Sequence, residues 1–227
     1  MTGPHRDART RIKICGVTNV EIAEAAIDAG ADALGFVCSP SSPRAVIVEA
    51  AEQVASQLPP FVTPVGVFVI SEIDSRDVDV RPDWAHGPFD TWSFPTIQLH
   101  GEANRQRVRT LSLRQRAIRA VPFDPERIKY WESLKTIDAL LVDSPNPGGG
   151  EQFDHDALAQ LMPSLSKPVI LAGGLTPENV GEAILTVRPW GVDVSSGVES
   201  SRGVKDAGLI RAFCQAVREA DAAMDAK

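Results

Sequence analysis

Eight short apolar segments, separated by stretches of helical character, constrain this chain more than any other feature. They are rich in β-branched residues and almost continuously apolar, which is typical of parallel strands covered on both faces. The segments are Arg11–Cys15, Ala33–Val37, Pro64–Val69, Thr96–His100, Arg116–Val121, Ala139–Asp143, Pro168–Ala172 and Gly191–Ser195. Eight strands alternating with helices predict an α/β fold, either an open doubly wound sheet or a closed barrel. The count of eight, and the lack of a Gly-x-Gly-x-x-Gly pattern after the first segment, favour a single (β/α)8 TIM barrel.

Helix signals lie between these segments. Thr18–Glu21 has a capping-box pattern and opens an Ala-rich amphipathic stretch that stops at Gly30. Thr176–Pro177 predicts an N-cap and a first-turn proline for a helix over Glu178–Val187. A last helix is expected over 207–223, where apolar residues recur at helical spacing.

No composition break suggests a second domain. We expect a barrel over 11–222, preceded by a disordered tail of residues 1–10 and followed by a short tail of residues 223–227. Asp83–Phe89 holds too many helix breakers for a regular third helix. A short helix followed by an irregular loop is therefore expected between Val69 and Thr96.

The composition excludes several classes of partner. The chain has 227 residues, of which 43% are hydrophobic and 23% charged, as in ordinary globular proteins. A net charge of −7 without a Lys/Arg cluster argues against nucleic acid, although a local pocket can still attract a small anion. No apolar run approaches the ~20 residues that span a bilayer, and the first ten residues lack a leader's apolar region. Three cysteines do not form a disulfide framework, so we expect a cytoplasmic protein.

Active sites of (β/α)8 barrels lie at the C-terminal ends of the strands. The polar residues expected there are Cys15, His100, Asp143 and Ser195, with Arg44 in the loop after the second strand. The pattern leaves two readings for Cys15, a general base as its thiolate or a small buried hydrophobe. Asp143 likewise ends an apolar strand as a functional carboxylate or as a turn residue before Pro145.

Glycines after the seventh and eighth strands are a more specific signal. The loops after these strands usually bind phosphate in such barrels, because glycine lets backbone N–H groups approach the oxygens. We expect a phosphorylated small-molecule substrate at Gly173, Gly174, Ser195, Ser196 and Gly197. Gly203–Asp206 is expected to supply the short extra helix of such a site.

Other polar residues of the strands are assigned to structure. Lys13 and Asp193 lie on the first and last strands, which become neighbours on closure, and are expected to form an ion pair inside the barrel. His100 is expected to pack beside Gln98. Only four histidines occur, so no metal site is expected.

Taken together, the motifs resemble those of the phosphoribosylanthranilate isomerase family, from about residue 11 to 218. The matching stretches are Lys13–Thr18, Gly30–Phe36, Val65–Val69, Gln98–Glu102, Leu171–Leu175 and Val192–Glu199. The chain departs from the family pattern at Ile70, at Pro147–Gly150, at His155 and in the length of the segment from 70 to 98.

The resemblance implies an Amadori rearrangement of N-(5-phosphoribosyl)anthranilate in tryptophan biosynthesis, without metal or organic cofactor. Asp143 matches the family's general acid, Cys15 its general base, and Arg44 the arginine that holds the anthranilate carboxylate. A monomer or a homodimer is expected.

Two alternatives are carried forward. A histidine-pathway aldose–ketose isomerase resembles two half-barrel repeats with an aspartate ending the first strand, whereas this chain has Cys15 there and no repeat. A non-catalytic barrel that binds a phosphorylated metabolite is the alternative from another class. A turnover assay separates this last alternative from an enzyme.

Overall fold

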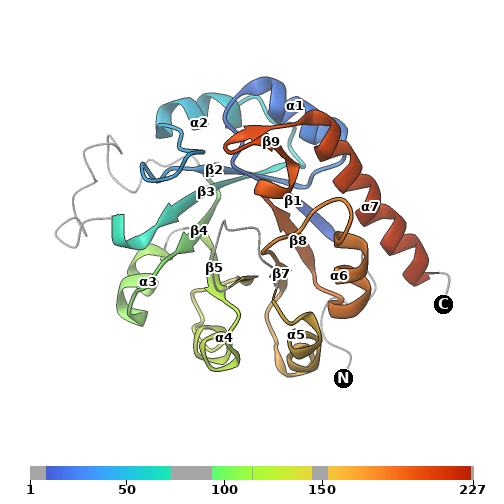
Figure 1. Cartoon of the computed structure of the whole chain (residues 1–227). Coiled ribbons are helices and arrows are strands. Elements are labelled where there is room, and N and C mark those ends of the chain that lie inside the picture. The colour runs from blue at the N-terminus through green and yellow to red at the C-terminus, as the bar shows by residue number, and fades with distance from the viewer. Residues whose placement is uncertain (1–8, 73–93, 114, 145–152, 226–227) are drawn as a thin grey trace.

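Eight parallel strands close into a barrel surrounded by helices (Figure 1). The computed structural model describes residues 9–72, 94–113, 115–144 and 153–225. Each strand pairs with the next along the chain, and β1 pairs with β8 to close the sheet. The expected (β/α)8 barrel is confirmed.

The strands and helices alternate in chain order. The barrel strands are β1 (Arg11–Cys15), β2 (Ala33–Val37), β3 (Thr63–Val69), β4 (Thr96–His100), β5 (Arg116–Pro122), β6 (Ala139–Asp143), β7 (Val169–Leu171) and β8 (Gly191–Val194). The helices are α1 (Val20–Asp28), α2 (Val48–Ala55), α3 (Arg105–Leu111), α4 (Pro125–Glu132), α5 (His155–Leu161), α6 (Val180–Val187) and α7 (Ala207–Asp225). Short elements complete the fold: the 3-10 turns η1 (Ile70–Glu72), η3 (Met162–Ser164) and η4 (Ser196–Val198), and a hairpin of β9 (Glu199–Ser201) and β10 (Val204–Lys205).

Strand alternation divides the buried residues between two cores. Ile14 points outward and packs in the large core between strands and helices. Cys15 points inward and packs in the smaller core that fills the barrel, with Val65 and Leu141 among its members. This is the period-two consequence of a closed sheet covered on both faces. The expected inward orientation of Cys15 is confirmed.

Two helix starts differ from the predicted ones. Asn19, not Thr18, caps α1, because its side-chain oxygen accepts the Ile22 N–H at 2.9 Å. α6 begins at Val180 rather than at Glu178. The Asn179 side chain accepts the N–H of Thr176 at 2.8 Å, which folds residues 176–179 into a turn before the helix.

The predicted N-terminal tail of residues 1–10 is wrong for its last two residues. Thr10 is buried, and its N–H and hydroxyl both donate to the Asp221 carboxylate of α7, at 3.0 and 2.6 Å. Arg9 pairs with Asp32 through two hydrogen bonds. The chain is therefore attached to the barrel from Arg9 onward, and residues 1–8 lie outside the described residues.

The C-terminal boundary also differs. α7 continues to Asp225, so the predicted tail of residues 223–227 begins too early. The apolar stripe of α7 packs against α1 and α6 and covers the seam between β1 and β8 (Figure 1). η1 agrees with the short helix expected after Val69, and the rest of that loop, from 73 to 93, lies outside the described residues.

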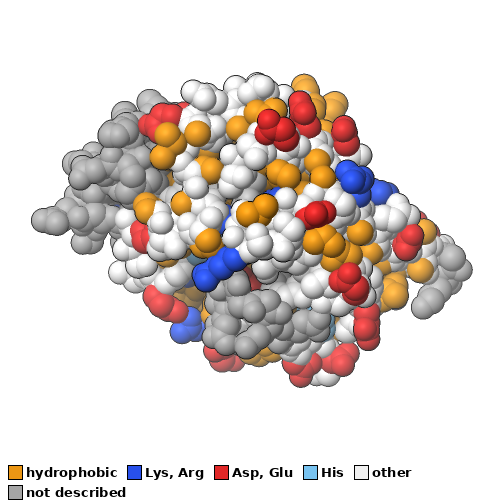
Figure 2. All heavy atoms as spheres, turned by 45° about the horizontal axis from the view of Figure 1, so that its top comes forward, with side chains coloured by type: hydrophobic (Ala, Val, Ile, Leu, Met, Phe, Trp, Pro, Cys, Tyr) orange, Lys and Arg blue, Asp and Glu red, His pale blue; other side chains and the backbone are white. Residues whose placement is uncertain are grey.

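The surface gives no sign of a nucleic-acid footprint on the face that includes the top of Figure 1. Figure 2 shows Lys and Arg there only in separate small groups among the described residues, with Asp and Glu widely scattered. None of the helices in the described part of the chain combines the length and apolarity that crossing a bilayer requires.

Candidate active site

Cys15 lies at the C-terminal end of β1, inside the mouth of the barrel. Cys15 is 7% exposed, and it lies opposite Gly35 of the neighbouring strand β2. A Cβ on Gly35 would lie 2.9 Å from the Cys15 sulfur and 2.9 Å from Lys13 Nζ. The thiol and the ammonium group therefore share the space that the glycine leaves open.

The positive charges around Cys15 oppose the effect of its burial, whereas the charge of Asp193 adds to it. Burial raises the pKa of the Cys15 thiol, while the positive charges of Lys13 and Lys205 act to lower it. Burial acts to lower the pKa of Lys13, but the interactions with Asp193 and Cys15 together outweigh it, and the Lys13 pKa is raised. Lys13 therefore stays protonated and provides a cation beside the sulfur.

Asp143 ends β6 in the same mouth and is 9% exposed. Burial raises the pKa of its carboxyl to about 6, with Asp193 adding to the rise and the Ser144 N–H, which donates to Oδ1 at 2.7 Å, opposing it. A carboxyl with this pKa is protonated in about a tenth of molecules at pH 7, against less than about a thousandth at the ordinary pKa, and this favours a role as general acid.

The glycine loops after β7 and β8 contact each other and the end of β6. Gly173 and Gly174 have positive φ angles of 85° and 64°. A Cβ on Gly173 would lie 2.5 Å from the Ser144 backbone nitrogen, and one on Gly197 would lie 1.9 Å from the Leu175 carbonyl oxygen. Only glycine fits these two close approaches, which bring both predicted phosphate loops together at the mouth.

The short extra helix was predicted at the wrong residues. It is η4, Ser196–Val198, whereas Gly203–Asp206 contains the turn and second strand of the β9–β10 hairpin. Gly203 at φ 86° favours that tight turn. Ser195, the residue before η4, donates its hydroxyl hydrogen to the Cys15 carbonyl oxygen at 3.1 Å. This bond ties the end of β8 to the end of β1.

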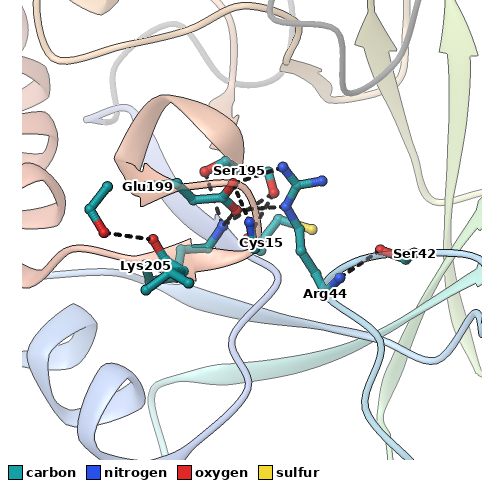
Figure 3. A network of polar contacts seen from close by, with 9 residues as sticks. Cys15, Ser42, Arg44, Ser195, Glu199 and Lys205 are labelled. Atoms are coloured by element: carbon teal, nitrogen blue, oxygen red, sulfur yellow. Dashed lines mark hydrogen bonds and ion pairs between the residues drawn. The ribbon is translucent and has the colours of Figure 1, made fainter.

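Arg44 reaches the same region from the loop after β2 (Figure 3). Its side chain passes so close to Gly16 that a Cβ there would lie 2.7 Å from Arg44 Cδ. The guanidinium forms two hydrogen bonds to Glu199, from Nε to Oε1 at 2.6 Å and from Nη2 to Oε2 at 2.9 Å. Lys205 Nζ lies 2.6 Å from the same Oε1.

Sequence analysis missed Glu199 and Lys205 as members of the site. Burial acts to raise the pKa of Glu199, but the hydrogen bonds from Arg44, Lys205 and the Gly203 N–H lower it to about 2. The available signal was position, because Glu199 directly follows the Ser195–Val198 motif. An acidic residue next to an expected anion site would by itself repel the anion. Glu199 fits the site only because Arg44 and Lys205 pair with it.

The structural assignments of Lys13, Asp193 and His100 are confirmed as contacts. Lys13 Nζ lies 2.7 Å from Asp193 Oδ1 on neighbouring strands, and both side chains are buried. Gln98 Nε2 lies 2.5 Å from His100 Nε2. Burial, with the charges of Lys13 and Arg119, lowers the pKa of His100 to about 3, so its imidazole is neutral.

A cavity of about 470 Å³ lies at the opposite end of the barrel. Arg11, Thr96, Arg116 and Gly191, at or near the N-terminal ends of their strands, are among its lining residues. Chemistry in this fold is located at the other end, so the cavity is not the candidate active site. Within the described residues, no group of three His, Cys, Asp or Glu side chains is arranged to hold a metal ion.

A family model described as N-(5'phosphoribosyl)anthranilate (PRA) isomerase matches residues 12–216. This chain belongs to the phosphoribosylanthranilate isomerase family. The N-(5'-phosphoribosyl)anthranilate isomerase of Leptothrix cholodnii is 41% identical over 220 residues, covering 95% of this chain and 94% of that protein.

Solved structures of the phosphoribosylanthranilate isomerase family share the fold. One, in complex with reduced 1-(o-carboxyphenylamino)-1-deoxyribulose 5-phosphate, is 36% identical with a TM-score of 0.75, covering 92% of this chain and 99% of that one. Monomers generated from the dimeric Thermotoga maritima enzyme are 33% identical with a TM-score of 0.75 and the same coverage. The expected family, fold and enzyme class, an isomerase of tryptophan biosynthesis, are confirmed.

Proposed function

We propose that this chain converts N-(5-phospho-β-D-ribosyl)anthranilate into 1-(2-carboxyphenylamino)-1-deoxy-D-ribulose 5-phosphate, the Amadori step of L-tryptophan biosynthesis. One observation carries the proposal. A buried thiol and a carboxyl with a raised pKa end different strands, at the mouth where two glycine loops meet, in a member of this family. The isomerisation of a phosphorylated aldose needs a general acid, a general base and a phosphate-binding site close together.

Asp143 and Cys15 divide the proton transfers in this proposal. The Asp143 carboxyl protonates the ribose ring oxygen, the bond from C1′ to that oxygen breaks, and the anthranilate nitrogen lone pair forms the Schiff base. The Cys15 thiolate then removes the C2′ proton to give an enolamine, which becomes the ketone as C1′ gains a proton. These steps move only protons and electron pairs of the substrate, so they need no metal or organic cofactor.

The phosphate belongs at the glycine loops. Backbone N–H groups around Gly173, Gly174, Ser196 and Gly197 can approach an anion closely, because three of these four residues are glycines with no side chain to block it. Ser195 directly precedes Ser196, and its hydroxyl donates a hydrogen bond to the Cys15 carbonyl oxygen. A product complex should show the phosphate bonded at these loops, and a phosphate held elsewhere contradicts the assignment.

Arg44 is proposed to bind the anthranilate carboxylate. It lies beside Gly16 and thus next to Cys15 at the mouth, where the aromatic ring of the substrate would enter. A guanidinium suits a benzoate carboxylate, since its planar donors can form two parallel hydrogen bonds.

The deciding experiment is a turnover assay that follows the loss of substrate fluorescence. Turnover with formation of the expected product supports the proposal. Tight binding of substrate without turnover would instead establish a non-catalytic binding barrel. Turnover of a histidine-pathway aldose alone would establish that rival isomerase.

We further propose a monomer or a homodimer that works in the cytoplasm. All three cysteines are buried and free, which agrees with a compartment that keeps thiols reduced. Sedimentation at working concentrations distinguishes the two assembly states.

A further inference from the structure

Glu199 is a buried carboxylate that the proposed proton transfers do not use. Its side chain is 4% exposed, and it begins β9 directly after the phosphate loop. Burying an ionised carboxylate is costly unless it is paired and hydrogen-bonded. Its partners therefore indicate what it does.

The first partner fixes the orientation of Arg44. Glu199 occupies the guanidinium side that carries Nε and one hydrogen of Nη2. A guanidinium has five N–H donors in a fixed plane, so Nη1 and the second Nη2 hydrogen form another edge. Among the described residues, the hydrogen bonds of the Arg44 side chain run from Nε and Nη2, both to Glu199, and none runs from Nη1. That edge remains available for a second carboxylate.

The second partner holds Glu199 in place. Lys205 is 1% exposed at its side chain and bonds to Glu199 Oε1, to the Ser195 carbonyl oxygen at 3.0 Å and to the Ser195 hydroxyl at 3.3 Å. The Gly203 N–H donates to Glu199 Oε2 at 3.0 Å. The hairpin residues thereby fix the Glu199 carboxylate, and the carboxylate in turn orients Arg44 (Figure 3).

The charges of the cluster suit an anionic ligand. Arg44 and Lys205 carry one positive charge each and Glu199 one negative charge, so the cluster keeps a surplus positive charge beside Cys15. An orienting carboxylate that consumed all the positive charge would repel the substrate carboxylate. Because Arg44 and Lys205 both pair with Glu199, the cluster keeps a positive charge and avoids this repulsion.

We infer that Glu199 is a positioning residue that presents the free edge of Arg44 to the carboxylate on the aromatic ring of the substrate. This inference rests on the proposed function, in which Arg44 binds that carboxylate. Without Glu199 the Arg44 side chain would lose its fixed orientation, and ordering it would then weaken binding.

The test compares Glu199→Gln with a matched control. Asp32→Asn removes the charge from another acid–Arg pair, with Arg9, which is held by two hydrogen bonds at the opposite end of the barrel. Affinity for the product, and for an analogue that lacks the ring carboxylate, is measured by titration calorimetry, together with kcat and KM. Thermal melts establish that each variant is folded.

We expect Glu199→Gln to weaken product binding ~10-fold, in the range for hydrogen bonds to charged groups, and to raise KM more than it lowers kcat. Affinity for the carboxylate-free analogue should change less than about 2-fold. Asp32→Asn should leave both affinities, kcat and KM unchanged. If Glu199→Gln does not fold, Glu199→Asp keeps the charge at a shorter reach and should show a smaller loss for the product alone.

A double-mutant cycle with Arg44→Ala separates the two hypotheses. In the Arg44→Ala background, Glu199→Gln should have almost no further effect on product affinity. Additive losses, or equal losses for product and carboxylate-free analogue, overturn the role of Glu199. If Arg44→Ala alone leaves product affinity unchanged, the proposed role of Arg44 fails instead.

Discussion

Gly35 of β2 leaves the space that the Cys15 sulfur of β1 occupies, since a Cβ at position 35 would lie 2.9 Å from it. Alanine there must displace the thiol or the neighbouring Lys13 ammonium. Small misplacements of a reacting group cost large factors in rate. We expect Gly35→Ala to lower kcat at least ~10-fold in the turnover assay.

Gly181→Ala provides the control for this substitution. Gly181 lies in α6, where the nearest atoms to an added Cβ are 3.9 and 4.0 Å away. Alanine should leave kcat unchanged and should not lower stability, because alanine is more favourable than glycine in a helix. Near-normal kcat in Gly35→Ala would mean that the sulfur position is not critical.

Cys15→Ser and Asp143→Asn test the proposed base and acid. Both changes keep the shape of the side chain, so the fold should persist. Each should lower kcat by at least ~100-fold, the low end for acid–base groups. A variant that retains near-normal kcat by single-turnover and steady-state measurements rules out the role assigned to its residue.

Asp143 should also make stability depend on pH. Its pKa rises from 3.8 in the unfolded chain to about 6 in the fold, so the folded state binds the proton more tightly. The fold is therefore destabilised as pH rises from 3.8 through 6, by up to about 3 kcal/mol at ~1.4 kcal/mol per pKa unit. Asp143→Asn should raise the free energy of unfolding at pH 8 and change it little at pH 4.

Urea titrations at the two pH values measure this difference. If Asp143→Asn has the same effect at both pH values, the carboxyl is not held neutral by burial.

The Lys13–Asp193 pair predicts a stability pattern across the seam. Both side chains are buried, at 5% and 8% exposure. Lys13→Met leaves Asp193 as an uncompensated buried charge, which should cost about 3–5 kcal/mol. The double variant Lys13→Met with Asp193→Leu should regain most of that loss in urea unfolding. If the double variant is as unstable as Lys13→Met, the loss of stability does not come from the unpaired charge of Asp193.

The strands were predictable because each is covered on both faces. Without a solvent-facing side, their apolar runs are hardly interrupted, and the predicted bounds differ from the observed ones by one residue at most at either end. Helix starts were less predictable. Thr18 competes with Asn19, and Thr176 with Asn179, and both residue types favour caps. Tertiary contacts decide which one is used.

The residues of the candidate site likewise include some that the sequence predicts and some that it does not. Cys15 and Asp143 followed from their positions at strand ends, and the glycine loops from their place after the last two strands. The Glu199–Arg44 pair joins residues that are 155 positions apart. Its second cation, Lys205, lies in a hairpin that sequence analysis took for a helical turn. Nothing local to either residue specifies such a contact.

The seam between β1 and β8 also sets the time at which activity can first arise during synthesis. Lys13 is made 180 residues before Asp193. At about 5–20 residues per second, the ribosome needs roughly 9–36 s to supply the missing neighbour. Until then Cys15 belongs to an edge strand with no β8 beside it, and Arg44 has no Glu199 to hold it. The first strand to leave the ribosome is among the last to gain its second partner, so a growing chain completes its catalytic mouth in one late step.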